Sequence, residues 1–254
     1  MKSIFLHRFR FKRLYLPSQN RYFMTKNKPR ASQDRRTRLF SARKYFSVIQ
    51  KPIKKSFNSS IDIIDSIHQT NINLNNIEVR ETNSIYYNGS INYDDLGIPY
   101  ALDISKLNNE KPITIFHEIG HLIDLVGVGT PGQFESRNPD GLFANILKTA
   151  FASPEIIKIK NIVISKIIHV DGKQIPLPPN TIRYLAYLID PCEIVARSYA
   201  QYIVRKSNSK ILVKMLQNRK KDNKFGEQWS EKSFEPLLSE WNNFLNSIGW
   251  HVKK

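Results

Sequence analysis

The stretch that decides the fold is PITIFHEIGHLIDLVG, residues 112–127, in which two histidines stand four positions apart. Pro112 suits the first turn of a helix, and apolar residues fill most of the stretch. Side chains at i and i+4 leave one face of a helix, so His117 and His121 can reach one ion. Glu118 lies beside that face, where its carboxylate can take a proton from a water. The pattern predicts one catalytic Zn²⁺ per chain.

The simpler alternative is a helix that carries these polar residues by chance, or a relic of such a site that no longer works. Charged groups within an apolar helix need a compensating partner, which favours the zinc interpretation. Gly120 costs about 1 kcal/mol of helix propensity against alanine. A close approach of another backbone beside the site would explain that glycine.

The elements around this stretch predict an α+β domain over residues 57–254, because strands come first and helices follow. A helix is expected at 57–70, and three short strands lie within 77–104, with Asn88-Gly89 as a hairpin turn. The stretch 170–179 is expected to be a loop. Further helices are expected at 141–152, 154–167, 181–189, 191–206 and 232–250.

The positive charge is concentrated at the N-terminus. Residues 1–56 carry 17 Lys or Arg against the single acid Asp34, whereas residues 57–254 carry 22 bases and 21 acids. We therefore expect a flexible basic arm before a nearly neutral domain. Four roles remain open for the arm: a solvated tail, a segment that binds nucleic acid or an anionic surface, an organellar transit peptide, and a membrane-surface helix.

No run of residues has the length and apolar character of a membrane span, and basic residues interrupt the early apolar ones. We therefore expect a soluble protein without a transmembrane segment or a secretory signal peptide. The N-terminus is transit-peptide-like but equally compatible with a phage, virion or effector protein, so the sequence does not assign a compartment. The single cysteine, Cys192, excludes an intramolecular disulfide and is expected to be a small buried thiol.

Two histidines leave a catalytic zinc site one protein ligand short. The best candidate is Glu193, in the first turn of a helix that Pro191 begins, on a face of small and apolar residues. A carboxylate in a first turn is also an ordinary partner of the helix dipole. Both interpretations of Glu193 stay open on the residues alone.

HEIGHLID at 117–124 and EIVARSYAQYI at 193–203 together resemble zincin-type metallopeptidases of the anthrax lethal-factor-like group, and related domains on phage and mobile-element polyproteins. The resemblance covers residues 77–250. It implies a zincin-like fold with a small mixed sheet, an active-site helix and a mostly helical C-terminal half. It also implies a zinc endopeptidase acting on proteins or peptides, with Glu193 as the third ligand. Ile194 and Val195 depart from the aromatic residues usual in that group, which alters packing and leaves metal chemistry intact.

Other residues take roles only through this comparison. Asp124 is a candidate hydrogen-bond partner of a ligating imidazole, an alternative metal ligand, or a plain helical acid. Arg197 either orients the Glu193 carboxylate or faces solvent. Tyr184 and Tyr187 precede Glu193 roughly where related enzymes place an oxyanion-stabilising tyrosine, although the spacing matches neither well and both can be structural.

The strand around Tyr100, Ala101, Leu102 and Asp103 is expected to be the sheet edge on which an extended substrate peptide lies. The rival hypothesis is a non-enzymatic, virion-associated protein that keeps a zincin fold and binds nucleic acid through its arm. An intact Glu118 favours the enzyme, because a structural zinc site has no use for a general base.

Overall fold

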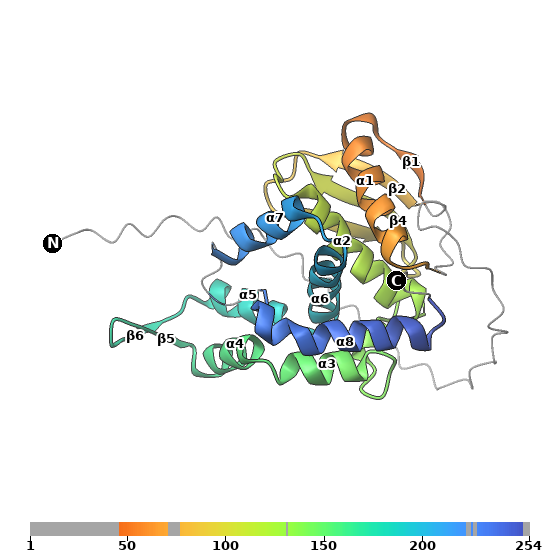
Figure 1. The fold of residues 1–254 in the computed structure, drawn as a ribbon. Coiled ribbons are helices and arrows are strands. Elements are labelled where there is room, and N and C mark those ends of the chain that lie inside the picture. Colours follow the sequence, from red (N-terminus) through yellow and green to blue (C-terminus); the bar gives the residue numbers. More distant parts are fainter. Residues whose placement is uncertain (1–45, 71–76, 131, 222–224, 226–227, 251–254) are drawn as a thin grey trace.

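The computed structural model describes residues 46–70, 77–130, 132–221, 225 and 228–250. A small sheet with α1 and α2 forms one part of the molecule, helices from the C-terminal half form the other, and α6 lies between them (Figure 1). This arrangement confirms the predicted α+β class. No helix in these described ranges is both long and apolar enough to cross a membrane.

The main sheet has four strands in the order β1-β2-β4-β3. Their bounds are β1 Phe46–Ile49, β2 Ile77–Thr82, β3 Gly89–Tyr93 and β4 Pro99–Ser105. β2 is parallel to both β1 and β4, whereas β3 is antiparallel to β4. Leu102 of β4 is fully buried between Val79 of β2 and Ile91 of β3 in this register. The mixed sheet therefore places β3 at one edge.

The predicted hairpin turn at Asn88-Gly89 is wrong. Residues 83–88 form no strand, so no strand precedes Gly89 with which β3 could form a hairpin at this turn. The actual hairpin joins β3 to β4 through residues 94–98, where the Asp94 carboxylate accepts hydrogen bonds from the backbone N–H groups of Leu96 at 2.9 Å and Ile98 at 2.8 Å. Gly97 supplies the positive φ of 74° that this turn needs.

The boundary predicted for the basic arm is also wrong at its C-terminal end. β1 and the first turn of α1, Lys51–Ile67, belong to the folded domain. Phe46 packs edge-on against Phe57 with ring centroids 4.6 Å apart, and Ile53 is fully buried. Apolar side chains spaced among the lysines of this segment complete the core. The rest of the arm, residues 1–45, and the roles predicted for it lie outside the described residues.

The remaining helices follow the predicted order closely. α2 spans Lys111–Leu122 and widens into a π-helical turn, Ile123–Gly127. A short 3₁₀ helix follows at Glu135–Arg137. The later helices are α3 Ala144–Phe151, α4 Pro154–Ser165, α5 Pro179–Leu188, α6 Pro191–Lys206, α7 Lys210–Lys221 and α8 Glu231–Ser247.

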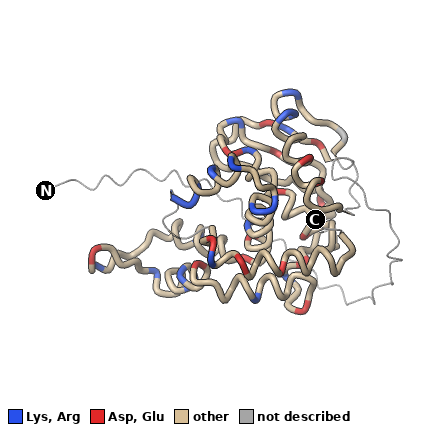
Figure 2. Tube along the Cα trace, viewed as in Figure 1, with Lys and Arg blue, Asp and Glu red and all other residues tan. Residues whose placement is uncertain are grey.

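Two elements of the C-terminal half were not predicted. α7 is one, and the other is a hairpin of β5, Ile167–Val170, with β6, Lys173–Pro176, within and beside the expected loop. Asp171 and Gly172 both have positive φ, which is the backbone that a two-residue hairpin turn requires. The Asp-Gly pair was the available signal. Lys and Arg are interspersed with Asp and Glu over most of the described chain (Figure 2).

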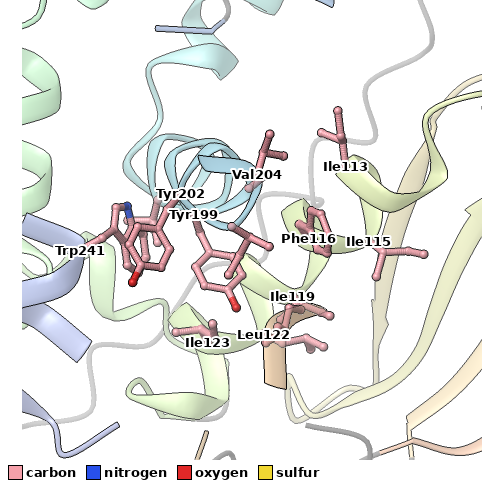
Figure 3. Packing of buried hydrophobic residues seen from close by; sticks show 14 of the residues in the cluster. Ile113, Ile115, Phe116, Ile119, Leu122, Ile123, Tyr199, Tyr202, Val204 and Trp241 are labelled. Carbon is pink, nitrogen blue, oxygen red and sulfur yellow. The ribbon is translucent and has the colours of Figure 1, made fainter. Parts of the chain in front are cut away.

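The packing of α6 on α2 fixes the centre of the molecule (Figure 3). Ile119 and Leu122 of α2 lie in the same buried cluster as Tyr199 of α6. Tyr199 also packs against Trp241 of α8 with ring centroids 5.3 Å apart, and the Trp241 indole donates a hydrogen bond to Ser198 at 3.1 Å. α6 is buried on nearly all sides, so the polar groups in its first turn must find partners within the protein.

Candidate metal centre

The two histidines of α2 lie one helical turn apart, and the Nε2 atom of one ring faces the Nε2 atom of the other. Their Nε2 atoms are 3.2 Å apart, and the rings are perpendicular with centroids 4.7 Å apart. Two neutral imidazoles can satisfy this contact only if one of the facing nitrogens carries a proton. A cation between the two rings would satisfy both lone pairs at once.

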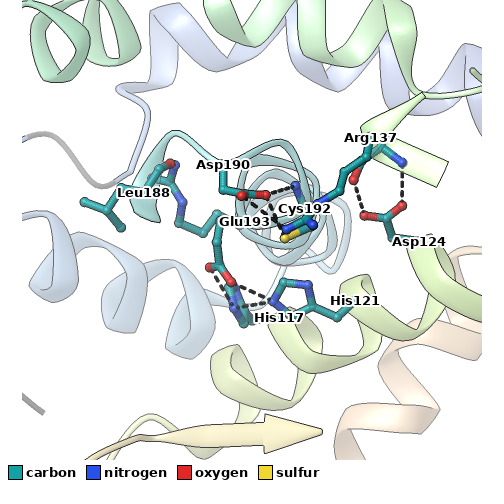
Figure 4. A network of polar contacts seen from close by, with 10 residues as sticks. His117, His121, Asp124, Arg137, Leu188, Asp190, Cys192 and Glu193 are labelled. Atoms are coloured by element: carbon teal, nitrogen blue, oxygen red, sulfur yellow. Dashed lines mark hydrogen bonds and ion pairs between the residues drawn. The ribbon is translucent and has the colours of Figure 1, made fainter. Parts of the chain in front are cut away.

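Glu193 reaches the same point from the first turn of α6. Its Oε1 lies 3.1 Å from Nε2 of His121, and its Oε2 lies 3.5 Å from Nε2 of His117 (Figure 4). Asp190 caps this helix by accepting a hydrogen bond from the backbone N–H of Cys192 at 3.1 Å, which fixes the turn that presents Glu193. The structure therefore brings together the three residues that the sequence proposed as ligands.

The spacing of the three groups fits a metal ion. Zinc bonds of 2.0–2.1 Å in a tetrahedral arrangement put neighbouring ligand atoms about 3.3 Å apart. The three contacts in this cluster measure 3.1, 3.2 and 3.5 Å, with the two carboxylate oxygens of Glu193 each directed at a different histidine. With one ligand atom taken from each residue, the three atoms lie within 4.8 Å of one another. Two imidazole nitrogens and a carboxylate oxygen are also a donor set that zinc accepts. No other group of three His, Cys, Asp or Glu side chains in the described part of the chain gathers in this way.

The charges within the cluster also favour a cation. Burial lowers the pKa of His117 to about 3, so this imidazole is neutral. Burial also disfavours the charged form of His121, but the charge and hydrogen bond of Glu193 outweigh it and raise the pKa of His121 to about 9. Burial raises the pKa of Glu193, and His121 outweighs that effect, bringing it to about 2. The carboxylate is therefore ionised and attracts positive charge to this point.

Glu118 lies next to the cluster and is 5% exposed. Burial raises its pKa to about 7, partly offset by the charge of His121. A carboxylate with such a pKa can both accept and release a proton near neutral pH. β3 makes room for it, because a Cβ atom at Gly89 would lie only 2.7 Å from Glu118 Oε1 and 2.6 Å from Thr114 Cγ2.

Gly120 lies where α2 and α6, the helices that carry the candidate ligands, touch. A Cβ atom at this position would stand 2.8 Å from the Cα of Ala196 and 3.3 Å from the Cβ of Tyr199. The close backbone approach that the sequence predicted is thus present. It allows the first turn of α6 to reach the histidine face of α2.

Asp124 does not bind a ligand imidazole. Its carboxylate accepts hydrogen bonds from the backbone N–H of Ser136 at 2.7 Å and from the Ser136 hydroxyl at 2.5 Å. Nδ1 of His121 is buried and has no hydrogen-bond partner within the described residues. The π-helical turn that begins at Ile123 moves Asp124 off the position that an α-helix would give it. Asp124 instead anchors the loop after α2.

Arg197 is buried, so it does not face solvent, and its predicted role in orienting Glu193 stays a prediction. Its guanidinium donates a hydrogen bond to the Leu188 carbonyl and lies over the Trp229 ring, 5.2 Å from the centroid. These contacts compensate for the burial of the Arg197 charge, which lies one helical turn after Glu193 on α6.

The two tyrosines of α5 have different contacts. The Tyr187 hydroxyl acts on Glu193 as a hydrogen-bond donor and helps to lower the pKa of that carboxylate. Tyr184 is half-buried and packs against the hydrophobic core. Tyr187 therefore supports a candidate ligand, and the oxyanion role proposed for Tyr184 and Tyr187 stays a prediction.

The substrate strand was predicted at the wrong place in the sheet. β4, which contains Tyr100, Ala101, Leu102 and Asp103, pairs with β2 on one side and β3 on the other, so it has no free edge. The Asp103 carboxylate is bound to Arg80 at 2.7 Å and to Asn92 at 2.9 Å. The strand order is non-local, and the sequence contains no local signal for it. The edge strand beside α2 is β3.

Three further residues at the site were missed from the sequence. Ser136 donates hydrogen bonds to Asp124, and the ring centroid of Phe134 lies 6.1 Å from that of His121. Burial and the charges of the site raise the pKa of Tyr93 of β3. Ser136 and Phe134 belong to the loop TPGQFESRNPDG, in which nothing local marks a partner of the helix before it. Only the folded chain reveals these neighbours.

Comparisons with family models, with curated proteins and with solved structures found no match for this chain.

Proposed function

We propose that this protein is a zinc-dependent metallopeptidase that hydrolyses peptide bonds, with His117, His121 and Glu193 as the metal ligands. The observation that carries the proposal is that one ligand atom from each of these three residues lies within 4.8 Å of the other two, so that one ion can be reached by all three. Zinc, when bound, would lower the pKa of a water and polarise the peptide carbonyl. A purely structural site usually has four protein ligands, whereas these three leave one position open.

Glu118 would act as the general base and then as the general acid. Its carboxylate takes a proton as the water oxygen attacks the carbonyl carbon, and it passes this proton to the amide nitrogen as the C–N bond breaks. The products are a carboxylate and an amine. The raised pKa of Glu118, about 7, suits both steps at neutral pH.

β3 is the strand on which an extended peptide would lie. It is at the edge of the sheet, and Gly89 lies directly against Glu118. A peptide that paired with the free backbone groups of β3 would pass alongside the proposed base. This assignment replaces the one made for β4.

Zinc loading of the full chain, followed by incubation with a mixed peptide library, tests this function. We expect about one zinc per chain, cleavage of library peptides, and loss of cleavage after chelation. Glu118→Gln should keep the zinc and lower kcat by about 10²- to 10⁴-fold, because only proton transfer is removed.

The outcomes separate the two function hypotheses. A chain that refolds in zinc and binds none would contradict the metal site itself. A chain that binds zinc but cleaves no peptide would favour the non-enzymatic hypothesis. Near wild-type cleavage by Glu118→Gln would remove Glu118 from the role of base.

A further inference from the structure

α7 carries a positive charge that its own sequence does not balance. Residues 194–221 contain eight Lys or Arg and no Asp or Glu, and five of the eight belong to α7, Lys210–Lys221. The remainder of residues 57–254 carries 14 bases and 21 acids. Lys and Arg mark α7 along its length in Figure 2. The positive charge of the domain is therefore concentrated in this one segment.

The cations of α7 divide into two groups by burial and by partner. The partly buried Arg219 binds Glu110, the residue that precedes α2, at 2.7 Å. The partly buried Lys220 binds Glu231, the first residue of α8, at 2.8 Å. The fully exposed cations are Lys210, Lys214 and Lys221. Within the described ranges none of these three lysines forms an ion pair, so their charges are available to a partner outside the chain.

The three exposed lysines form a straight stripe along the helix. With 3.6 residues per turn, positions 210, 214 and 221 fall within about 40° of one another around the axis and span about 16 Å along it. Lys210 lies in the first turn, where the helix dipole disfavours a positive charge. Lys210 and Lys214 are like charges at i and i+4, which also destabilises a helix. An anionic partner would compensate both effects.

An exposed aliphatic side chain lies beside the stripe and indicates the class of partner. Ile211 is 69% exposed, whereas Leu212 and Leu216 bury the opposite side of α7, so the core does not use Ile211. α7 has no aromatic residue, so it lacks the stacking surfaces with which proteins hold single-stranded nucleic acid. Lysines next to an aliphatic side chain fit an acidic peptide that carries an apolar residue.

We propose that the outer face of α7, formed by Lys210, Ile211, Lys214 and Lys221, is a docking surface for a protein segment rich in Asp or Glu. The carboxylates of the segment pair with the lysines, and an apolar side chain covers Ile211. The inference goes beyond the proposed function, because binding at this face requires neither zinc nor cleavage. α7 contacts α2 and α6, the helices that carry the candidate ligands, so a protein docked there is held against the elements that form the candidate metal centre.

A fluorophore attached to the full chain at Asn218→Cys tests this surface. Asn218 is exposed on α7, and Cys192 is buried, so the label enters one position. The label must be local, because the basic residues of 1–45 also attract an anionic probe. The probe is a twelve-residue peptide of four Glu-Glu-Leu repeats, titrated with and without zinc. The test variant replaces the three α7 lysines, Lys210→Gln, Lys214→Gln and Lys221→Gln. The matched control replaces three exposed lysines of α1, Lys51→Gln, Lys54→Gln and Lys55→Gln.

The α7 variant should bind the probe at least about tenfold more weakly than the parent, with a smaller difference at high salt, whereas the α1 variant should change by less than about twofold. Thermal unfolding midpoints should not fall, because all six lysines are exposed. Ile211→Ser should weaken binding of this probe but not of a Glu-Glu-Ser probe, which separates the apolar contact from the charges.

Equal affinity of the α7 variant and the parent would overturn the docking surface. Tighter binding of an oligothymidylate of the same charge than of the peptide would overturn the choice of an acidic protein segment. If the parent bound the probe through α7 but the wild type cleaved no library peptide, the docking surface would stand and only the peptidase function would be contradicted.

Discussion

α6 meets histidines at two levels, and the histidines of the two sites have different hydrogen-bond partners. Tyr199 of α6 meets His68, whose Nε2 lies 2.9 Å from the Tyr199 hydroxyl and whose Nδ1 lies 3.1 Å from the Gln69 carbonyl. The His68 ring also stacks on Trp250, with centroids 6.0 Å apart. In the first turn of α6, Glu193 meets two imidazoles whose Nε2 atoms face each other.

The difference shows how a structural histidine can be told from a candidate ligand. Both nitrogens of His68 have partners, and burial lowers the pKa of His68 to about 4, so the ring is neutral and complete without an ion. The pair on α2 has a carboxylate and two facing nitrogens, an arrangement that needs a proton or a metal at its centre. Burial is common to both sites. The number of satisfied nitrogens distinguishes them.

The largest expected effect follows from removing the carboxylate. Glu193→Ala should weaken zinc binding by about 100-fold or more, because loss of a ligand costs at least as much as loss of an outer partner. Glu155→Ala is the matched control, since Glu155 also stands in the first turn of a helix, α4, away from the cluster. Competition with a zinc-binding dye measures both. Equal affinities would end the assignment of Glu193 as a ligand.

The pH dependence of zinc binding should give the next largest effect. In the metal-free protein His121 has its pKa raised to about 9, so zinc must displace one proton at neutral pH. The apparent zinc affinity should therefore fall by about tenfold for each pH unit below 9. His68, whose pKa is lowered to about 4, stays neutral in this range and does not contribute to the pH dependence of zinc binding. His68→Phe should leave the slope unchanged, and a pH-independent affinity would contradict the Glu193–His121 pair.

Gly120→Ala should affect both histidine sites, because Gly120 abuts Ala196 and Tyr199 together. Alanine favours a helix by about 1 kcal/mol, but its Cβ would stand 2.8 Å from the Ala196 backbone, which has no flexible end to yield. We expect a net loss of about 1 to 3 kcal/mol in the free energy of unfolding, together with weaker zinc binding. Urea denaturation with and without zinc measures the two effects, and a stabilised variant would show that the helices can separate freely.

The smallest effect on zinc binding is expected at His68. His68→Phe keeps a ring on Trp250 but leaves the Tyr199 hydroxyl without its partner, which should cost about 1 to 3 kcal/mol of unfolding free energy. Zinc affinity should not change. The double variant with Tyr199→Phe should recover part of the loss, because it removes both polar groups. A large change in zinc affinity in His68→Phe would show that the two sites are coupled.

The sign of the pH effect at His68 follows from its depressed pKa. The unfolded chain takes up a proton near pH 6.5, whereas the folded ring does so only near pH 4. The contribution of His68 to stability is therefore full above pH 6.5 and is lost progressively down to about pH 4. The stability difference between wild type and His68→Phe should shrink over this window.

The sequence by itself determined the features that depend on local spacing. Histidines four apart share a helix face whatever surrounds the helix, so the His117–His121 pair and the place of Glu118 followed from the motif. The order of elements gave the α+β class for the same reason, since the helical and strand periods are local properties. The Asp171-Gly172 hairpin was equally local and was overlooked.

Only the tertiary structure decided what depends on distant segments. Glu193 reaches the histidines because Gly120 lets α6 approach α2, and Asp124 turns to Ser136 because the helix widens after Leu122. The edge position of β3 depends on how four strands far apart in the chain pair with one another. A carboxylate or a strand has the same local pattern whichever neighbour it meets, and the partners are selected only when the complete core packs.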